Sequence, residues 1–515
     1  MLRLHELLCF MRAYPDDRRV LAQVNRMLAG FASRFDLRRH RIALTDSGIA
    51  GTRLRYRYYW PTARRLAARW PAQLEVDWDA LDEPVMLAGA LPLIMTPIEA
   101  AWLRGGNPVP RAALARLAGK RIASGAFLVR RVEAYAGDDA SREAFFDALD
   151  TPLVLRPGAD TPSRTLARHA RSAVTFVTQP LRRERPNLRA ELRRPPQAIR
   201  RTSRAEGAQL IELAFGALVT RARDIDGIAY GNPDDVWVID DGDGLQWAFI
   251  GIMPARRQVL RASHGFITLR SGVPIGYGQL DTLFQCSDVS FNSFDTFRGA
   301  STAWVFVRLL AAARAVLGAC AFTLDGYQLG HHNDEAIASG AWWFYYKLGF
   351  RPRDTAIRRI AAAELARMAR DAGHRSSPAT LRRLAAGTLY FESEGVRAPL
   401  WPRLAGLGAM AADRLAALGG ADREAALATC AKLATQRLGL ASFPGFPGRR
   451  ADIEMAWQRW APVVAQMKLA GWSARERRAL AAIIAAKGGR SERDFLRLLD
   501  AHPRIAATLR ELCRA

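Results

Sequence analysis

The feature that most constrains this chain is a change in its hydrophobic spacing near residue 236. Just before that point, apolar residues such as Leu210, Leu213 and Leu218 recur at helical intervals. Residues 236–239 and 245–253 instead have the character of strands, and the Asp-Asp-Gly-Asp-Gly between them favours a hairpin turn. A chain that contains such a block does not fold as helices alone. The pattern therefore predicts a sheet in its middle third.

Further strands are predicted over 265–269, 273–278, 288–294 and 321–324, with helices over 204–226, 302–317 and 335–348. Residues 1–150 and those beyond 351 are predicted to be mainly helical. The expected fold is α+β, with a mixed-sheet core flanked by two mainly helical, basic regions. A length of 515 residues suits about three domains, which we place at 1–200, 201–355 and 356–515. Prolines and arginines within 156–204 predict an exposed basic connector.

Charge follows the same division of the chain. Residues 1–200 hold 34 basic and 20 acidic side chains, residues 201–350 hold 12 and 15, and residues 351–515 hold 29 and 15, for a net charge of +25. This excess favours polyanionic partners such as nucleic acid or phosphorylated molecules, although a solvated basic surface also accounts for it. The arginines Arg53, Arg55 and Arg57 alternate and would share one strand face. That face is either an anion-binding surface or a solvated edge.

The cysteine content and the length of the apolar runs indicate the cellular compartment in which the protein is expected. Five cysteines without a CxxC pair argue against a disulfide framework or a cysteine zinc site, and they favour a reducing environment. The longest apolar run, residues 85–97, is too short to span a bilayer. We therefore expect a cytoplasmic protein with no membrane span and no bound metal.

Three segments of the middle third resemble a known family. They are VPIGYG (273–278), VSFNSFDTFRGASTAW (289–304) and NDEAIASGAWWFYYKLGF (333–350). Together they are similar to the GNAT N-acetyltransferase superfamily over about 205–355, and the final segment is the most specific. The resemblance implies an enzyme, an N-acyltransferase that moves the acyl group of acetyl-CoA or another acyl-CoA to an amine acceptor.

The resemblance also implies a set of cofactor-binding residues. A basic–glycine turn that opens a helix can hold a pyrophosphate, because amide groups at a helix N-terminus point at the anion. The residues assigned to this role are Phe294, Arg298, Gly299, Ala300, Ser301, Thr302 and Ala303, with Asn333 at the pantetheine arm or as a helix cap. Ser301 stands where the family pattern usually has glycine, which departs from the motif.

Three residues are expected to carry the chemistry. In the register of the resemblance, the amide of Ser293 polarises the acyl carbonyl and Tyr345 protonates the departing thiolate, with Tyr346 as the alternative acid. A base for the acceptor amine is less evident. Asp288 is the first candidate, although a regular strand turns it away from the preceding Ser287, and His264, His331 and His332 are further candidates.

Two other classes of function remain open. The basic flanks suit a transferase of the same fold that uses an aminoacyl-tRNA as donor. Ser301 and the missing base suit a non-enzymatic binding protein whose acyl-CoA site has decayed.

Overall fold

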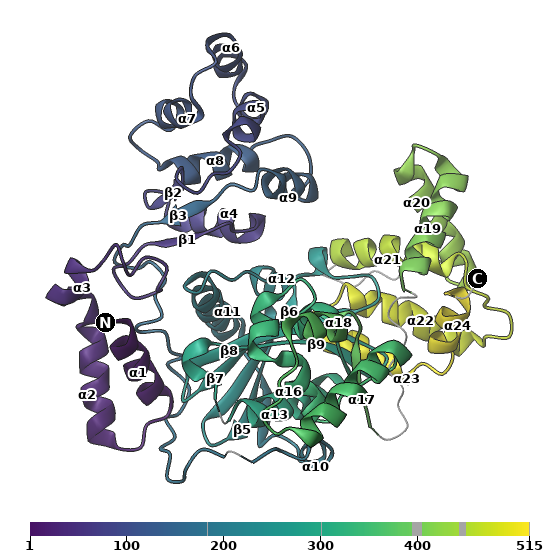
Figure 1. Cartoon of the computed structure of the whole chain (residues 1–515). Helices are drawn as coiled ribbons and strands as arrows, with labels where there is room; N and C mark the ends of the chain where they lie inside the picture. Colours follow the sequence, from purple (N-terminus) through teal and green to yellow (C-terminus); the bar gives the residue numbers. More distant parts are fainter. Residues whose placement is uncertain (183, 300, 394–403, 442–449, 514–515) are drawn as a thin grey trace. The chain divides into compact units, whose positions relative to one another are not determined.

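A nine-stranded mixed sheet is formed by strands between residues 198 and 392 (Figure 1). The structure is a computed structural model that describes residues 1–182, 184–299, 301–393, 404–441 and 450–513. The strand order is β11-β12-β10-β9-β8-β7-β6-β5-β4. The strands are β4 (Ala198–Arg201), β5 (Gly231–Gly242), β6 (Leu245–Ile252), β7 (Ala262–Arg270), β8 (Val273–Leu283), β9 (Cys286–Ser293), β10 (Ala321–Leu324), β11 (Arg351–Pro352) and β12 (Leu389–Glu392). Together with the many helices, this sheet confirms the predicted α+β class.

The chain divides into two compact units. One comprises Met1–Thr178, Gln209–Tyr230 and Arg270–Pro274, and the other comprises Gln179–Ala208, Gly231–Leu269 and Ile275–Ala515. The large sheet belongs chiefly to the second unit. Two of its strands, β4 and β12, lie outside the core predicted at 201–355, so the sheet draws on both flanks. The division into three domains remains a prediction.

The first unit contains a small antiparallel sheet of its own, in the order β1-β3-β2. These strands are β1 (Leu54–Tyr56), β2 (Leu74–Val76) and β3 (Leu153–Leu155). The helices of this unit are α1 (Leu2–Ala13), α2 (Arg18–Ala29), α3 (Phe35–Arg39), α4 (Trp60–Arg69), α5 (Pro84–Ile94), α6 (Pro97–Gly106), α7 (Pro110–Ala118), α8 (Ser124–Glu133), α9 (Asp139–Ala148) and α12 (Asp226–Ala229). Helix α11 (Arg204–Val219) runs from the second unit into the first.

Two predicted elements of the core match the structure residue for residue, and the helix predicted before Gly349 differs from it most. Helix α13 (Thr302–Leu317) and strand β10 have the predicted bounds. The helix predicted over 335–348 is instead two helices, α15 (Asp334–Ser339) and α16 (Ala341–Lys347). Gly340 separates them with a φ of +67°, a left-handed conformation that glycine adopts without a steric penalty. This break changes the direction of the chain just before Tyr345.

The stretch predicted to be an exposed connector contains regular structure. Helix α10 (Leu188–Arg193) buries Leu188 and Leu192, and β4 pairs antiparallel with β5. Arg308 of α13, which is almost wholly buried, donates to the carbonyls of Glu191 and Arg194 at 2.6 and 2.9 Å. Its other nitrogens bond the buried carboxylate of Asp241. A buried cation with this many partners ties α10 to the core.

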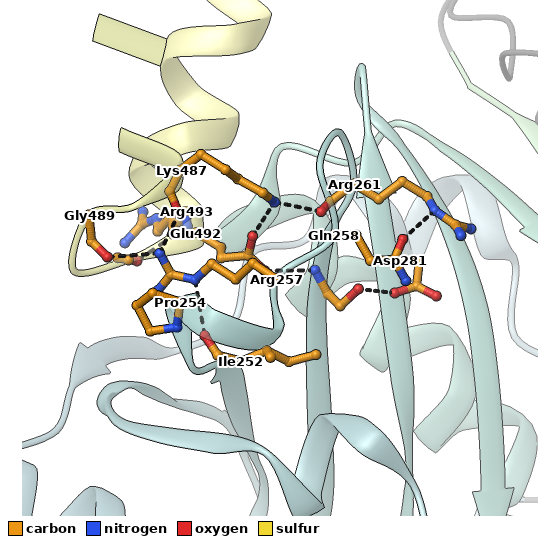
Figure 2. Close-up of polar contacts among 12 residues, drawn as sticks. Ile252, Pro254, Arg257, Gln258, Arg261, Asp281, Lys487, Gly489, Glu492 and Arg493 are labelled. Atoms are coloured by element: carbon orange, nitrogen blue, oxygen red, sulfur yellow. Dashed lines mark hydrogen bonds and ion pairs between the residues drawn. The ribbon is translucent and has the colours of Figure 1, made fainter. Parts of the chain in front are cut away.

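Helices that follow the sheet are also anchored to it by buried charges. Figure 2 shows Lys487, at the end of α22 (Ala474–Lys487), donating to Glu492 at the start of α23 (Glu492–Ala501) and to the carbonyl of Arg261. Arg257 reaches the carbonyls of Lys487 and Gly489 at 2.8 and 2.7 Å. The remaining helices are α17 (Thr355–Arg370), α18 (Pro378–Ala385), α19 (Leu404–Gly419), α20 (Arg423–Arg437), α21 (Arg450–Val464) and α24 (Ile505–Leu512).

None of the helices in the described part of the chain has the length and apolar character that crossing a bilayer requires.

Candidate active site

Strands β9 and β10 run parallel but pair over a short distance. The register joins Cys286, Ser287 and Asp288 of β9 to residues 321–323 of β10. β9 then continues to Ser293, whereas β10 ends at Leu324 and the chain turns into α14 (Gly326–Leu329). β10 therefore ends one residue after its last pair with β9, and the edge of β9 beyond Asp288 has no partner strand; we call this unpaired edge the gap.

The side chain of Gln328, on α14, bridges this gap. Its carboxamide accepts a hydrogen bond from the amide of Phe291 at 3.3 Å and donates to the carbonyl of Phe291 at 2.8 Å. The same nitrogen donates to the hydroxyl of Tyr345 at 2.7 Å. Gln328 thus forms with Phe291 of β9 the two hydrogen bonds that a peptide group of a neighbouring strand would form. Neither Gln328 nor Phe291 was assigned a role from the sequence, because no motif marks such a contact.

Tyr345, the predicted acid, reaches the gap from α16. Its ring is buried against Phe306 of α13 and Phe350, with centroids 5.1 and 6.2 Å away. Burial raises the pKa of the phenol well above its usual value, and the hydrogen bond from Gln328 opposes that rise. Since the oxygen accepts from Gln328, the hydroxyl proton is free to point elsewhere. The alternative, Tyr346, stacks instead on Trp342 at 5.0 Å.

The amide of Ser293 lies on the same edge of β9 as the amide of Phe291. The amide of Phe294 donates to the carbonyl of Ile275 in β8, at 3.0 Å. Amides of successive residues in a strand point to opposite edges. The Ser293 amide therefore faces away from β8 and toward the gap, as the role of a carbonyl polariser requires.

Asp288 lies at the closed end of the gap. Its carboxylate accepts a 2.5 Å hydrogen bond from Thr323 of β10. Burial, reinforced by the charges of Asp325 and Asp281, raises its pKa to about 7, which suits a base near neutral pH. Three positions separate it from Phe291, so it faces the opposite side of the sheet at about 10 Å along the strand.

The predicted phosphate turn presents a basic side chain that is already paired. The guanidinium of Arg298 contacts the carboxylates of Asp295, at 2.8 Å, and Glu335, and it donates to the carbonyl of Ser293 at 2.9 Å. Phosphate binding by Arg298 would compete with these carboxylates. The charge expected to hold a pyrophosphate is thus partly neutralised.

The rest of the turn is small and open. A Cβ atom added to Gly299 would contact nothing within 4 Å, and the Gly299 amide donates to the hydroxyl of Thr302 at 3.1 Å. Ser301 is the residue before α13 and has helical backbone angles, so its side chain meets no conformational obstacle. Ala303 lies in the first turn of α13, where amides lack helical acceptors. Ala300 lies outside the described residues.

Two further residues assigned to the cofactor have structural partners. Asn333 caps α15 by accepting from the amide of Ala336 at 3.1 Å, and it donates to the carbonyl of Tyr327. Phe294 is buried and stacks on Tyr277 at 5.5 Å. These contacts fix the start of α15 and the residue that follows β9.

The three histidines proposed as alternative bases differ in their burial. His264 on β7 is completely buried, and burial lowers its pKa. His331 and His332 are exposed and contact each other at a ring distance of 4.1 Å. Among the described residues, no group of three or more His, Cys, Asp or Glu side chains is arranged to hold a metal ion.

Comparison with known proteins adds no assignment. No protein-family model matches the chain, and no curated protein or solved structure is detectably similar to it.

Proposed function

We propose that the protein is an acyl-CoA-dependent N-acyltransferase whose thioester binds in the gap between β9 and β10. The observation that carries the proposal is the edge of β9 that has no partner strand beyond Asp288, together with the buried Tyr345 hydroxyl linked to that edge through Gln328. A pantetheine arm contains secondary amides, which match the peptide groups that Phe291 presents there. The carboxamide of Gln328 already occupies that position. Binding in this mode therefore displaces the Gln328 carboxamide from the backbone of Phe291, and we propose that its hydrogen bond to Tyr345 is retained.

The proposed reaction is direct attack of an acceptor amine on the thioester. The amine nitrogen forms a bond to the carbonyl carbon as the carbon–sulfur bond breaks, with the Ser293 amide donating to the carbonyl oxygen. The departing thiolate takes the proton of Tyr345, whose buried phenol is fully protonated at neutral pH. The amine gives up a proton through water to Asp288. One proton leaves the acceptor and one reaches the thiol, so the overall step is balanced.

Calorimetry with acetyl-CoA and longer acyl-CoAs tests binding, and mass spectrometry of the same mixtures with a panel of amines tests transfer. We expect saturable binding of at least one acyl-CoA and an acylated amine that accumulates with free CoA. A search for acyl-CoA retained by the purified protein identifies the chain length independently. If no acyl-CoA of any length binds, the proposal is wrong.

A non-enzymatic binding protein whose acyl-CoA site has decayed is the second candidate. The pairing of Arg298 with Glu335 and Asp295 favours it, because these carboxylates compete with phosphate for the guanidinium. Failure of every acyl-CoA to bind would favour this candidate over acyl transfer. A transferase that uses aminoacyl-tRNA as its acyl donor remains a prediction from the basic flanks. Such an enzyme would bind tRNA with an affinity that falls as the salt concentration rises.

A further inference from the structure

The small sheet of the first unit brings three polar side chains together at one of its ends. Leu54 of β1 and Leu74 of β2 both pair with Leu155 of β3. Because the strands are antiparallel, the residue before β1, the residue before β2 and the residue after β3 lie at the same end of the sheet. Those residues are Arg53, Gln73 and Arg156. Strands β1, β2 and β3 lie side by side in Figure 1.

A fourth polar side chain is brought to this end by a hydrogen-bonded turn. The amide of Asp46 donates to the carbonyl of Arg53 at 2.8 Å, and its carboxylate accepts from the amide of Arg55 at 2.7 Å. These bonds dock the segment that follows α3 against β1, and Arg41 lies on that segment. The result is a pocket of about 430 Å³ lined by Arg41, Arg53, Ala72, Gln73, Arg156 and Pro157.

The charges around this pocket are unevenly paired. Of the three alternating arginines, Arg55 binds Asp46, and Arg57 binds Asp82 and Asp150. The guanidinium groups of Arg53 and Arg41, by contrast, have no hydrogen-bond or ion-pair partner among the described residues, and both side chains are exposed. The sheet thus neutralises two arginines of the series and leaves the third at the pocket.

Arg156, another arginine of the pocket, is held in place by its own contacts. Arg156 donates to the carbonyl of Ala72 at 2.7 Å and pairs with Glu75 at 3.3 Å, and its amide donates to the carbonyl of Gln73 at 2.9 Å. One guanidinium nitrogen remains for a ligand. No carboxylate is among the residues that line the described pocket, and the carboxylate of Glu75 competes only for the guanidinium of Arg156. Arginine forks suit the geometry of phosphate oxygens.

We propose that this pocket binds the phosphate or diphosphate group of a small molecule. Its volume is within the range of small-molecule sites, and Ala72 and Pro157 supply an apolar wall beside the charged groups. Arg41 and Arg53 contact the phosphate oxygens, Arg156 adds a fixed third donor, and Gln73 contributes an amide. The site lies wholly within residues 1–178 and is independent of the proposed acyl transfer.

The test is calorimetry of the full chain with pyrophosphate and with adenosine 5′-diphosphate. We compare the wild type with the double variant Arg41→Gln/Arg53→Gln. The matched control is Arg104→Gln/Arg111→Gln, which removes the same charge from exposed positions on α6 and α7 of the same unit. Loss of two charge-assisted contacts is expected to weaken binding at least about tenfold in the pocket variant. The control is expected to bind like the wild type.

Three outcomes would overturn the proposal. The first is no saturable binding of either probe to the wild type. The second is equal weakening in the pocket variant and the control, which would show a general effect of net charge. The third is binding of a single-stranded RNA oligonucleotide that depends on Arg41 and Arg53 while both small probes fail to bind. Circular dichroism of both variants checks that the fold is retained, and a loss confined to the pocket variant supports the proposal.

Discussion

The carboxamide nitrogen of Gln328 donates to the hydroxyl of Tyr345 at 2.7 Å and to the carbonyl of Phe291 at 2.8 Å. A single side chain therefore links the strand that would hold the thioester to the residue that would protonate its sulfur. This contact makes Gln328 both an occupant of the gap and a positioning residue for the phenol.

Replacing Gln328 by alanine separates these two effects. Removing the occupant is expected to leave acetyl-CoA binding as tight as in the wild type or tighter. Losing the hydrogen bond to Tyr345 is expected to lower turnover about fivefold, because such a bond contributes about 1 kcal/mol. Calorimetry measures the first effect and CoA release with an active amine measures the second. Weaker binding would contradict the displacement of Gln328 by the pantetheine arm.

Replacing Tyr345 by phenylalanine tests the proton donor. The aromatic packing against Phe306 is kept, so the affinity for acyl-CoA should change little. Turnover should fall by about 10²-fold or more, as for loss of a general acid. The matched control is Tyr346→Phe, whose ring stacks on Trp342 beside the same helix. Unchanged turnover in the Tyr345 variant would remove its assigned role.

The pH dependence of the reaction reports on Asp288. A base must be ionised, so the rate is expected to rise with pH through about 7 and then level off. Asp288→Asn should abolish this rise of the rate with pH. Thr323→Val should move it to higher pH, because the Thr323 hydroxyl stabilises the carboxylate. An unchanged pH profile in the asparagine variant would assign the base elsewhere.

The same group affects the free energy of unfolding. Folding raises the pKa of Asp288 from 3.8 to about 7, so between these values the native state binds more protons than the unfolded chain. The contribution of Asp288 to stability is thus present at low pH and is lost as the pH rises through this window. Denaturant unfolding at pH 4, 5, 6 and 7 is expected to show a smaller decline in Asp288→Asn than in the wild type.

The ion pair between Arg308 and Asp241 is expected to be important for folding. Arg308→Met leaves the buried carboxylate of Asp241 with only the more distant Arg194 at 3.9 Å, so unfolding should become easier by about 3–5 kcal/mol. The exposed pair of Arg382 with Asp334 supplies the control, and Arg382→Met should cost less than about 1 kcal/mol. Urea unfolding of the two variants makes the comparison. Equal stabilities would show that α10 is not held by Arg308.

The sequence predicted most reliably those elements that have a local signal. Helix α13 and strand β10 have clear apolar spacing and turn residues at their ends, and their bounds agree with the prediction. Strands β4 and β12 were not predicted, because they are short and are stabilised by strands distant in sequence. The split of the helix at Gly340 was also missed, since an isolated glycine within a helical pattern does not require a break.

The contacts of the candidate site were less accessible to sequence reasoning. Tyr345 and the edge of β9 could be assigned through a resemblance, whereas Gln328 is found only when side-chain contacts are seen. The pairing of Arg298 with Glu335 likewise joins residues from a turn and a helix that no spacing rule connects. Geometry at the level of single hydrogen bonds depends on tertiary packing, which the pattern of residue types does not specify.

The antiparallel pairing of β12 with β10 has a practical consequence for dissecting the protein. A fragment ending near residue 355 would keep every segment that resembles an acyltransferase, yet the backbone groups along one side of β10 would be left without acceptors or donors. Such an open sheet margin invites self-association, so that fragment is expected to aggregate. Functional work therefore calls for chains that extend beyond Glu392.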